Sequence, residues 1–194
     1  MTGLKKKLAG FLVLLLFLFG TGLCEIPDFK QGDPRWVGIM YSNHGDPEQT
    51  IKKGGCGLCA IANVIAYWFD PAITPVEIAA LSVRTGHCTD KGGTYITFNE
   101  DITQYYPLRV IKSADIADAI KCLESGGLVV AVMSGGVWNQ KPTTRHAVTI
   151  YAHVDGDIYL HDPAWLDPFM SQIIGHTTVE KMASSAEWYY CYWK

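Results

Sequence analysis

Cys56 has the surroundings of a nucleophile. It follows Gly55, precedes Gly57, and begins a run of residues whose apolar spacing predicts a helix. The unpaired N–H groups and the positive dipole end of a first helical turn stabilise a thiolate, which is the nucleophilic form of cysteine. Glycines on both sides would let a substrate carbonyl come close to the backbone. By position alone, Cys56 fits a structural thiol or a disulfide partner equally well.

A β-hairpin is predicted further along the chain. Residues 147–154 and 158–160 have the apolar patterns of strands and flank a turn dipeptide. We expect a three-residue loop, Val154-Asp155-Gly156, with the glycine in the left-handed conformation. That loop pairs His153 with Asp157.

This register brings His146 and Asp162 to the same end of the hairpin. It sets Val148 opposite Asp162, and paired residues share a face of the sheet. The predicted apolar face carries His146, Val148, Ile150, Ala152, Ile158, Leu160 and Asp162. The other face, which we expect to be more solvated, carries Thr149, Tyr151, His153, Tyr159 and His161. A two-residue turn would put His146 and Asp162 on opposite faces.

A histidine held by a buried carboxylate can act as the base for a thiol. The carboxylate fixes the tautomer of the ring and stabilises it once it has taken a proton. Taken singly, His146 fits a core histidine and Asp162 fits a turn cap before Pro163. Together with Cys56 at a helix start, they favour catalysis.

These side chains must be positioned by helices that come first in the chain and strands that follow. Four helices are predicted, and the first and third are residues 56–69 and 97–105. The second has Thr74 as N-cap, Pro75 and Glu77 in its first turn, and Gly86 at its end. The fourth is residues 114–124, with Ser113 as cap and Gly126-Gly127 at its end. The predicted strands are 128–133, the hairpin, and a closing strand at 188–193. We expect an irregular arm over residues 25–53. This order predicts an α+β domain in which a helical half packs on an antiparallel sheet, with a site at the seam.

The N-terminus has the pattern of an export signal. Lys5, Lys6 and Lys7 precede a run, residues 8–19, that contains only Leu, Ala, Gly, Phe and Val. We expect residues 1–24 to be a signal peptide, or an uncleaved membrane anchor, and residues 25–194 to form a single monomeric domain outside the cytoplasm. Without the first 24 residues, 13 basic side chains face 19 acidic ones, a net charge of −6. That charge disfavours nucleic acid and anionic membrane surfaces as partners.

The order of the motifs resembles that of a known family. The matching stretches are residues 29–36, Gly55-Cys56-Gly57, Thr74-Pro75-Val76-Glu77, Gly92-Gly93-Thr94, Arg145-His146-Ala147-Val148 and His161-Asp162-Pro163. From about residue 29 to residue 165, the chain is similar to the C39-like cysteine peptidases of the papain-like superfamily.

The resemblance implies a papain-like fold and a peptidase acting on a peptide or protein. It implies Cys56 as nucleophile, His146 as general base and acid, and Asp162 as the residue that orients the histidine. Gln31 would donate to the oxyanion together with the backbone N–H of Cys56, an interaction that can contribute about 3 kcal/mol. No metal ion or organic cofactor is implied.

Other readings use the same residues. The acyl-enzyme chemistry also suits a thiol amidase or a transferase acting on cell-wall peptides, and a binding domain without activity could share the fold. Cys56 and Cys59 match the C-x-x-C pattern of redox proteins, and with His87 and Cys88 they supply zinc-type ligands. Because a redox motif of that kind follows a buried strand and the His87-Cys88 pair lacks a spacer, both are the weaker readings.

The sequence also allows expectations about four of the other cysteines and about residues 134–145. Cys59, Cys88, Cys122 and Cys191 could form two disulfides in three possible pairings, or stay reduced. The Gly-rich stretch at 134–145, which contains Trp138, is expected to overhang the cleft and help select the substrate.

Overall fold

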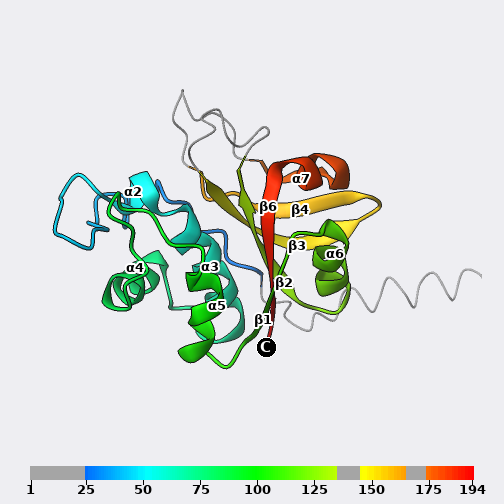
Figure 1. The fold of residues 1–194 in the computed structure, drawn as a ribbon, viewed down its shortest axis with the longest axis horizontal. Coiled ribbons are helices and arrows are strands. Elements are labelled where there is room, and N and C mark those ends of the chain that lie inside the picture. Colours follow the sequence, from blue (N-terminus) through cyan, green and yellow to red (C-terminus); the bar gives the residue numbers. More distant parts are fainter. Residues whose placement is uncertain (1–24, 135–144, 165–173) are drawn as a thin grey trace, which may run out of the picture.

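The computed structural model describes residues 25–134, 145–164 and 174–194 (Figure 1). The predicted export signal and the stretch around Trp138 lie outside these ranges. Within them, a group of helices from the N-terminal half packs against an antiparallel sheet from the C-terminal half (Figure 1). The predicted α+β arrangement is confirmed. No helix among the described residues combines the length and the apolarity that crossing a membrane requires.

The four predicted helices are present, and the structure adds α2 and α7, for which no bounds were predicted. The helices are α2 (Ile51–Gly54), α3 (Cys56–Trp68), α4 (Pro75–Arg84), α5 (Phe98–Asp101) with a 3-10 turn η1 (Ile102–Gln104), α6 (Ile116–Glu124) and α7 (Val179–Ser185). The capping box that begins α4 is present: Thr74 Oγ1 accepts from Val76 N (3.2 Å), and Glu77 Oε2 accepts from Thr74 N (2.8 Å). The predicted helix at 97–105 is the pair of α5 and η1.

The cap of α6 differs from the prediction. The N-cap is Asp115, whose carboxylate accepts from Ala117 N at 2.9 Å. Ser113 instead ends a strand that the sequence did not reveal, and its hydroxyl accepts from Asp115 N at 3.0 Å. An Asp and a Ser two residues apart are both good caps, so the sequence could not choose between them.

The six described strands form one sheet in the order β1-β6-β2-β3-β4-β5, with antiparallel neighbours. The strands are β1 (Arg109–Ser113), β2 (Leu128–Met133), β3 (His146–Val154), β4 (Asp157–His161), β5 (His176–Thr178) and β6 (Ala186–Trp193). β2, the predicted hairpin strands β3 and β4, and β6 were expected. The strands β1 and β5 lie at the two edges and are short or half exposed, so their apolar signal is weak.

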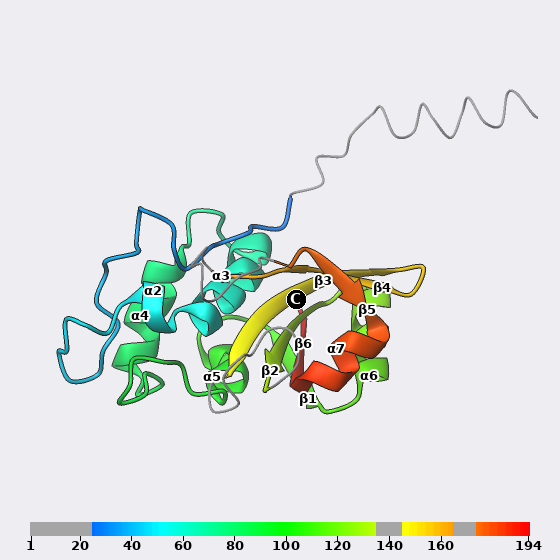
Figure 2. The same ribbon diagram turned by 90° about the horizontal axis from the view of Figure 1, so that it is seen from above.

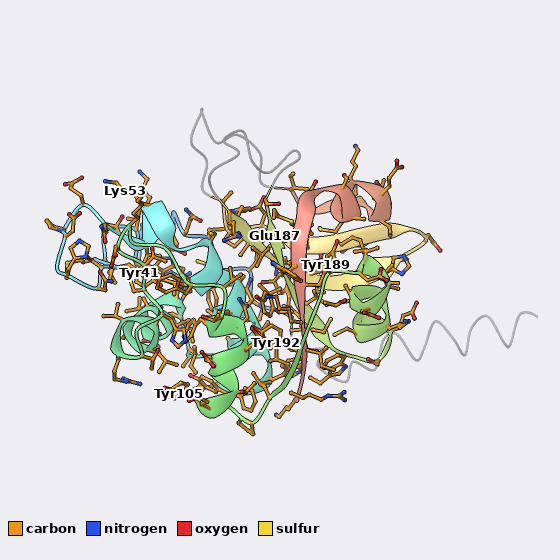
Figure 3. All side chains as sticks on the ribbon, in the orientation of Figure 1. Tyr41, Lys53, Tyr105, Glu187, Tyr189 and Tyr192 are labelled. Atoms are coloured by element: carbon orange, nitrogen blue, oxygen red, sulfur yellow. The ribbon has the colours of Figure 1, made fainter. Side chains whose placement is uncertain are left out.

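Both faces of the sheet are covered by helices. Helices α3 to α5 lie on one side, and α6 and α7 lie on the other (Figures 1 and 2). Tyr192 and Tyr189, both labelled in Figure 3, belong to the core on the α3 side and the core on the α6 side, respectively. On the α3 side, Tyr192 Oη donates to Asn99 Oδ1 at 2.8 Å. The alternation along β6 therefore fastens both layers to the sheet.

The turn between β3 and β4 is shorter than predicted. Val154 pairs with Asp157 across a two-residue Asp155-Gly156 turn in which both residues have positive φ, 52° and 88°. The three-residue loop expected from the sequence is therefore wrong. By the argument from register alone, His146 and Asp162 should then point apart.

A β-bulge at Tyr151 restores the register that brings His146 and Asp162 together. The pairing runs from Ala152 opposite Tyr159 to Ile150 opposite Leu160, which skips one residue of β3, and it continues with Thr149 opposite His161. At the end of the hairpin near His146, the register is the one predicted. The extra residue that was expected in the turn lies inside the strand.

The face predicted to be more solvated is covered near Thr149. This residue is 0% exposed, because α3 packs on that side of β3. Thr149 Oγ1 donates to the carbonyl of Ala60 (3.1 Å) and accepts from Asn63 Nδ2 (3.0 Å). The hydroxyl of a threonine in a strand can form its hydrogen bonds with a helix, so a polar residue at this position does not indicate a solvent-exposed face.

The arm is irregular apart from α2, but it is built into the fold. Phe29 N donates to Asn63 Oδ1 (3.0 Å), and Gln31 N donates to the carbonyl of Pro163 (2.9 Å). Trp36 and Tyr41 are buried in the core on the α3 side. Figure 2 shows the arm, in blue, passing along α3. It links the helical half to the end of β4.

The five described cysteines are free thiols. Of the pairs considered for disulfides, Cys122 of α6 and Cys191 of β6 belong to the same core, where Cys122 Sγ donates to the carbonyl of Leu128 (3.5 Å) and Cys191 Sγ to that of Asp118 (3.9 Å). Cys59 and Cys88 are buried on the α3 side of the sheet.

We expect Asn63→Ala to lower the free energy of unfolding by about 2 kcal/mol or more. The change leaves the N–H of Phe29 without its acceptor and removes the donor to Thr149, and unpaired buried groups cost about 1–3 kcal/mol each. Urea denaturation followed by circular dichroism measures the effect. Asn43→Ala, at an exposed asparagine, is the matched control and should cost less than about 1 kcal/mol. Equal losses in the two variants would contradict this role for Asn63.

Candidate active site

Cys56 is the first residue of α3, as predicted, and α2 ends just before it. The glycines around it are needed for close packing. A Cβ on Gly54 would lie 1.6 Å from the carbonyl oxygen of Gly92, and one on Gly57 would lie 3.2 Å from the side chain of Thr94. The segment from Gly92 to Thr94 therefore packs directly against the turn that carries Cys56.

His146 lies between Cys56 and Asp162. Its Nε2 donates to Asp162 Oδ1 at 2.7 Å, and its ring is hydrogen-bonded to the thiol of Cys56. Because Nε2 is committed to the carboxylate, the nitrogen left for the sulfur is Nδ1. The three residues that sequence reasoning selected are brought together in the order nucleophile, histidine and carboxylate.

Asp162 is fixed more firmly than a surface carboxylate would be. It is 1% exposed, and besides His146 it accepts from Ala164 N (2.9 Å, Oδ1) and from Ile174 N (3.4 Å, Oδ2). Lys30 Nζ donates to its backbone carbonyl at 2.8 Å. Both carboxylate oxygens and the backbone of Asp162 are therefore held in place.

The electrostatics favour an ion pair between Cys56 and His146. Burial opposes charge on Cys56, but the hydrogen bond and charge of His146, with the N–H groups of Ala147 and Gly57, outweigh it and lower the thiol pKa. Burial also opposes charge on His146, but the hydrogen bonds to Asp162 and Cys56 outweigh it and raise the histidine pKa to about 10.

Asp162 ionises readily in spite of its burial. Desolvation pushes its pKa up, but His146 and the N–H groups of Ala164 and Ile174 dominate, so its pKa lies below the usual value. The directions of all three shifts favour the combination of thiolate, imidazolium and carboxylate. This is the charge state in which a cysteine attacks a carbonyl carbon.

Gln31 is buried near this group, although it lies in the arm that was predicted to be irregular. The side chain is 5% exposed, and its Nε2 donates to the carbonyl of Lys52 at 2.5 Å, in the helix that leads into Cys56. No described partner accepts from its other amide hydrogen or donates to its buried Oε1. The structure thus places Gln31 against α2, with one N–H available.

Sequence reasoning missed three contributors to the site. Asn63 joins the arm to β3, Lys30 holds the backbone of Asp162, and the N–H of Ala147 faces the sulfur of Cys56. Asn63 carries a usable signal, because it is a lone amide among the apolar residues of α3. The other two depend on tertiary contacts that have no local pattern.

The structure also tests the weaker readings of the cysteines. The segment before Cys56 is α2 and not a buried strand, and the described sheet is antiparallel, which disagrees with a thioredoxin-type unit. His87 is paired with Asp101 (2.8 Å) and Thr85 (2.7 Å). Among the described residues, no group of three or more potential ligands is arranged to hold a metal ion, so the proposed zinc set does not assemble.

Comparison with known proteins identifies the fold. No protein-family model and no curated protein matches the chain. The crystal structure of a C39-like peptidase from Bacillus anthracis is similar, with a TM-score of 0.53 and 14% identity, over 89% of this chain and 96% of that one. The peptidase domain of Streptococcus ComA, a bi-functional ABC transporter involved in a quorum-sensing pathway, matches with a TM-score of 0.48 and 16% identity, over 71% of this chain and 88% of that one. The likeness to the Bacillus structure confirms the predicted papain-like fold.

We expect iodoacetamide to label Cys56 much faster than any other cysteine at pH 6. A free thiol has a pKa of about 8.5, so only a thiolate stabilised by His146 reacts quickly there. Peptide mapping of the reduced protein gives the rate at each site. His146→Ala should raise the Cys56 pKa and slow its labelling at pH 6 by more than about tenfold.

The control for this variant is His87→Ala, which removes another histidine that is paired with a carboxylate. It should leave the labelling of Cys56 unchanged. Similar slowing in both variants would show that His146 has no specific effect on the thiol.

We expect Asp162→Asn to lower the pKa of His146 from its value of about 10. The imidazolium is lost as the pH rises through the histidine pKa, and without the carboxylate this happens at lower pH. Titration of the His146 ring protons by NMR, in protein whose Cys56 is reduced and unmodified, measures the change. Asp101→Asn, at the carboxylate beside His87, should not move it, and an unchanged His146 pKa in Asp162→Asn would contradict the assignment.

Proposed function

We propose that the protein is a cysteine peptidase that hydrolyses peptide bonds through an acyl-enzyme outside the cytoplasm. The observation that carries the proposal is the sequence of contacts from the partly exposed Cys56 through His146 to the buried Asp162, with the 2.7 Å hydrogen bond from His146 to Asp162. The papain-like fold is consistent with it, and the signal-like pattern of residues 1–24 supports export.

In the first half of the reaction, the Cys56 thiolate attacks the carbonyl carbon of the scissile peptide bond. The negative charge that develops on the oxygen is stabilised by the backbone N–H of Cys56, which has no carbonyl partner within α3, and by the available N–H of Gln31. His146 then donates its proton to the leaving amine. The products are a free amine and a thioester on Cys56.

In the second half, neutral His146 removes a proton from a water molecule that attacks the thioester. The thiolate of Cys56 and the imidazolium of His146 are regenerated, and the carboxylic acid product leaves. Asp162 keeps the ring in one orientation and stabilises it whenever it carries the second proton. None of these steps changes an oxidation state.

An amidase or a transferase would use the same thioester. In a transferase the second nucleophile is an amine and not water, and the residues of the triad do not distinguish the two. We favour hydrolysis of peptides, and an added amine acceptor separates the alternatives, since it would appear in the product of a transferase.

We expect the purified protein to cleave members of a mixed peptide library, with products identified by mass spectrometry. Cys56→Ala should abolish cleavage. Gln31→Ala should lower kcat about 100-fold with little change in KM, because the amide acts on charge that exists only in the transition state. Gln104→Ala, at an exposed glutamine, should leave both constants unchanged. Cleavage that survives Cys56→Ala would disprove the proposal.

A further inference from the structure

The proposed reaction leaves one buried thiol beside the nucleophile without a role. Cys59 is three residues after Cys56 in the first turn of α3 and is 0% exposed. Residues three apart on a helix lie on the same side, with Cβ atoms about 5–6 Å apart. The nucleophile therefore has a second sulfur as a near neighbour, on the same helical face.

The two thiols differ in accessibility and in charge. Cys56 is partly exposed, at the end of the helix. Burial raises the pKa of Cys59 well above its usual value, and the negative charge of Cys56 raises it further. The ammonium of Lys30 acts in the opposite direction. Cys56 can thus react with a reagent from solvent, whereas the buried Cys59 is shielded from it.

We propose that Cys56 and Cys59 form a redox pair, in which a peroxide oxidises Cys56 and Cys59 then closes a disulfide that reversibly inactivates the site. The arrangement of the first turn carries this inference: one thiol at the helix end, a second one turn along on the same side, and no solvent access to the second. It extends the proposed function, because it needs Cys56 to be the reactive thiolate.

The chemistry is balanced with the peroxide as the only oxidant. The Cys56 thiolate attacks one peroxide oxygen and breaks the O–O bond, giving a sulfenic acid and, after protonation, water or an alcohol. The sulfur of Cys59 then attacks the sulfur of Cys56, forming the S–S bond as the hydroxyl group leaves. The proton from Cys59 and that hydroxide make water, so two thiols lose two electrons and one peroxide is reduced.

The first step prepares the second. Once Cys56 is a neutral sulfenic acid, the charge that raised the pKa of Cys59 has gone, whereas Lys30 Nζ stays in place through its bonds to Asp162 O (2.8 Å) and Asp28 (2.7 Å). Cys59 then ionises more easily. A disulfide needs Cβ atoms about 3.5–4.5 Å apart, so the first turn must tighten slightly. Cys56 is its terminal residue, where a helix most easily changes its shape.

The consequence is protection of the nucleophile. A sulfenic acid without a neighbouring thiol proceeds to sulfinic acid, which thiols do not reduce, whereas a disulfide returns to two thiols by exchange. Oxidation would thus switch the site off and leave it recoverable.

The test treats the reduced full chain with a slight excess of hydrogen peroxide at pH 7, blocks free thiols, and maps the peptides. Trypsin releases residues 54–84 as one peptide that contains Cys56 and Cys59 and no other cysteine. We expect this peptide to be unalkylated and lighter by two hydrogen atoms, and dithiothreitol should restore both thiols. In Cys59→Ala we expect two added oxygen atoms on Cys56, with no recovery.

Cys88→Ala, at another buried thiol of the helical half, is the matched control and should behave like the unmodified protein. The mapping of the unmodified chain stands by itself if Cys59→Ala does not fold. Sulfinic acid on Cys56 beside a free Cys59, in a protein whose Cys56 is still labelled quickly by iodoacetamide, would overturn the redox pair and leave the proposed function intact. A Cys56 that reacts with neither reagent would overturn both.

Discussion

The side-chain amide of Asn63 is the contact on which the arrangement of the site depends. It accepts from the arm at Phe29 and donates to β3 at Thr149, and it belongs to the helix that begins at Cys56. The three segments that supply Gln31, Cys56 and His146 therefore meet at one buried amide, which bonds to two of them through its oxygen and its nitrogen. A buried amide tolerates little displacement, because any shift leaves a donor or an acceptor unpaired. This amide therefore helps to fix α3 against β3, at a distance from Cys56 and His146 themselves.

The second anchor is the end of β4, where the chain reaches Asp162 and Pro163. Lys30 and Gln31 bond to the backbone carbonyls of these two residues, so the arm is fixed to the turn that holds the carboxylate. Asp162 in turn fixes His146, and His146 lowers the pKa of Cys56. The pair of Cys56 and His146 is thus positioned by the packing around it. Burial strengthens the attraction between their charged forms, because little water screens it.

The parts of the fold that could be predicted are those with a local physical signal. The helix from Cys56 and the capping box at Thr74 follow from apolar spacing and from side chains that satisfy the first turn. The pairing of His146 with Asp162 was predicted correctly for an incorrect reason, because the extra residue lies in a bulge at Tyr151 and not in the turn. Asp155-Gly156 suits either turn, and nothing in a strand sequence marks which residue will bulge. The burial of Gln31 and the covered side of Thr149 were beyond sequence reasoning for a related reason: both depend on segments distant in the chain.

The division of the site between two halves of the chain has a consequence for the reactivity of Cys56 before the chain has folded. The helical half alone holds Cys56, and the sheet half alone holds the histidine that ionises it. An unfolded or half-folded chain therefore carries an ordinary thiol, with a pKa near 8.5 and a small thiolate fraction at neutral pH. The contact of Cys56 with His146 joins residues 90 positions apart in the chain, so it exists only when the two halves are docked. The chemistry that we propose for Cys56 would therefore stay latent in any chain whose two halves have not yet docked.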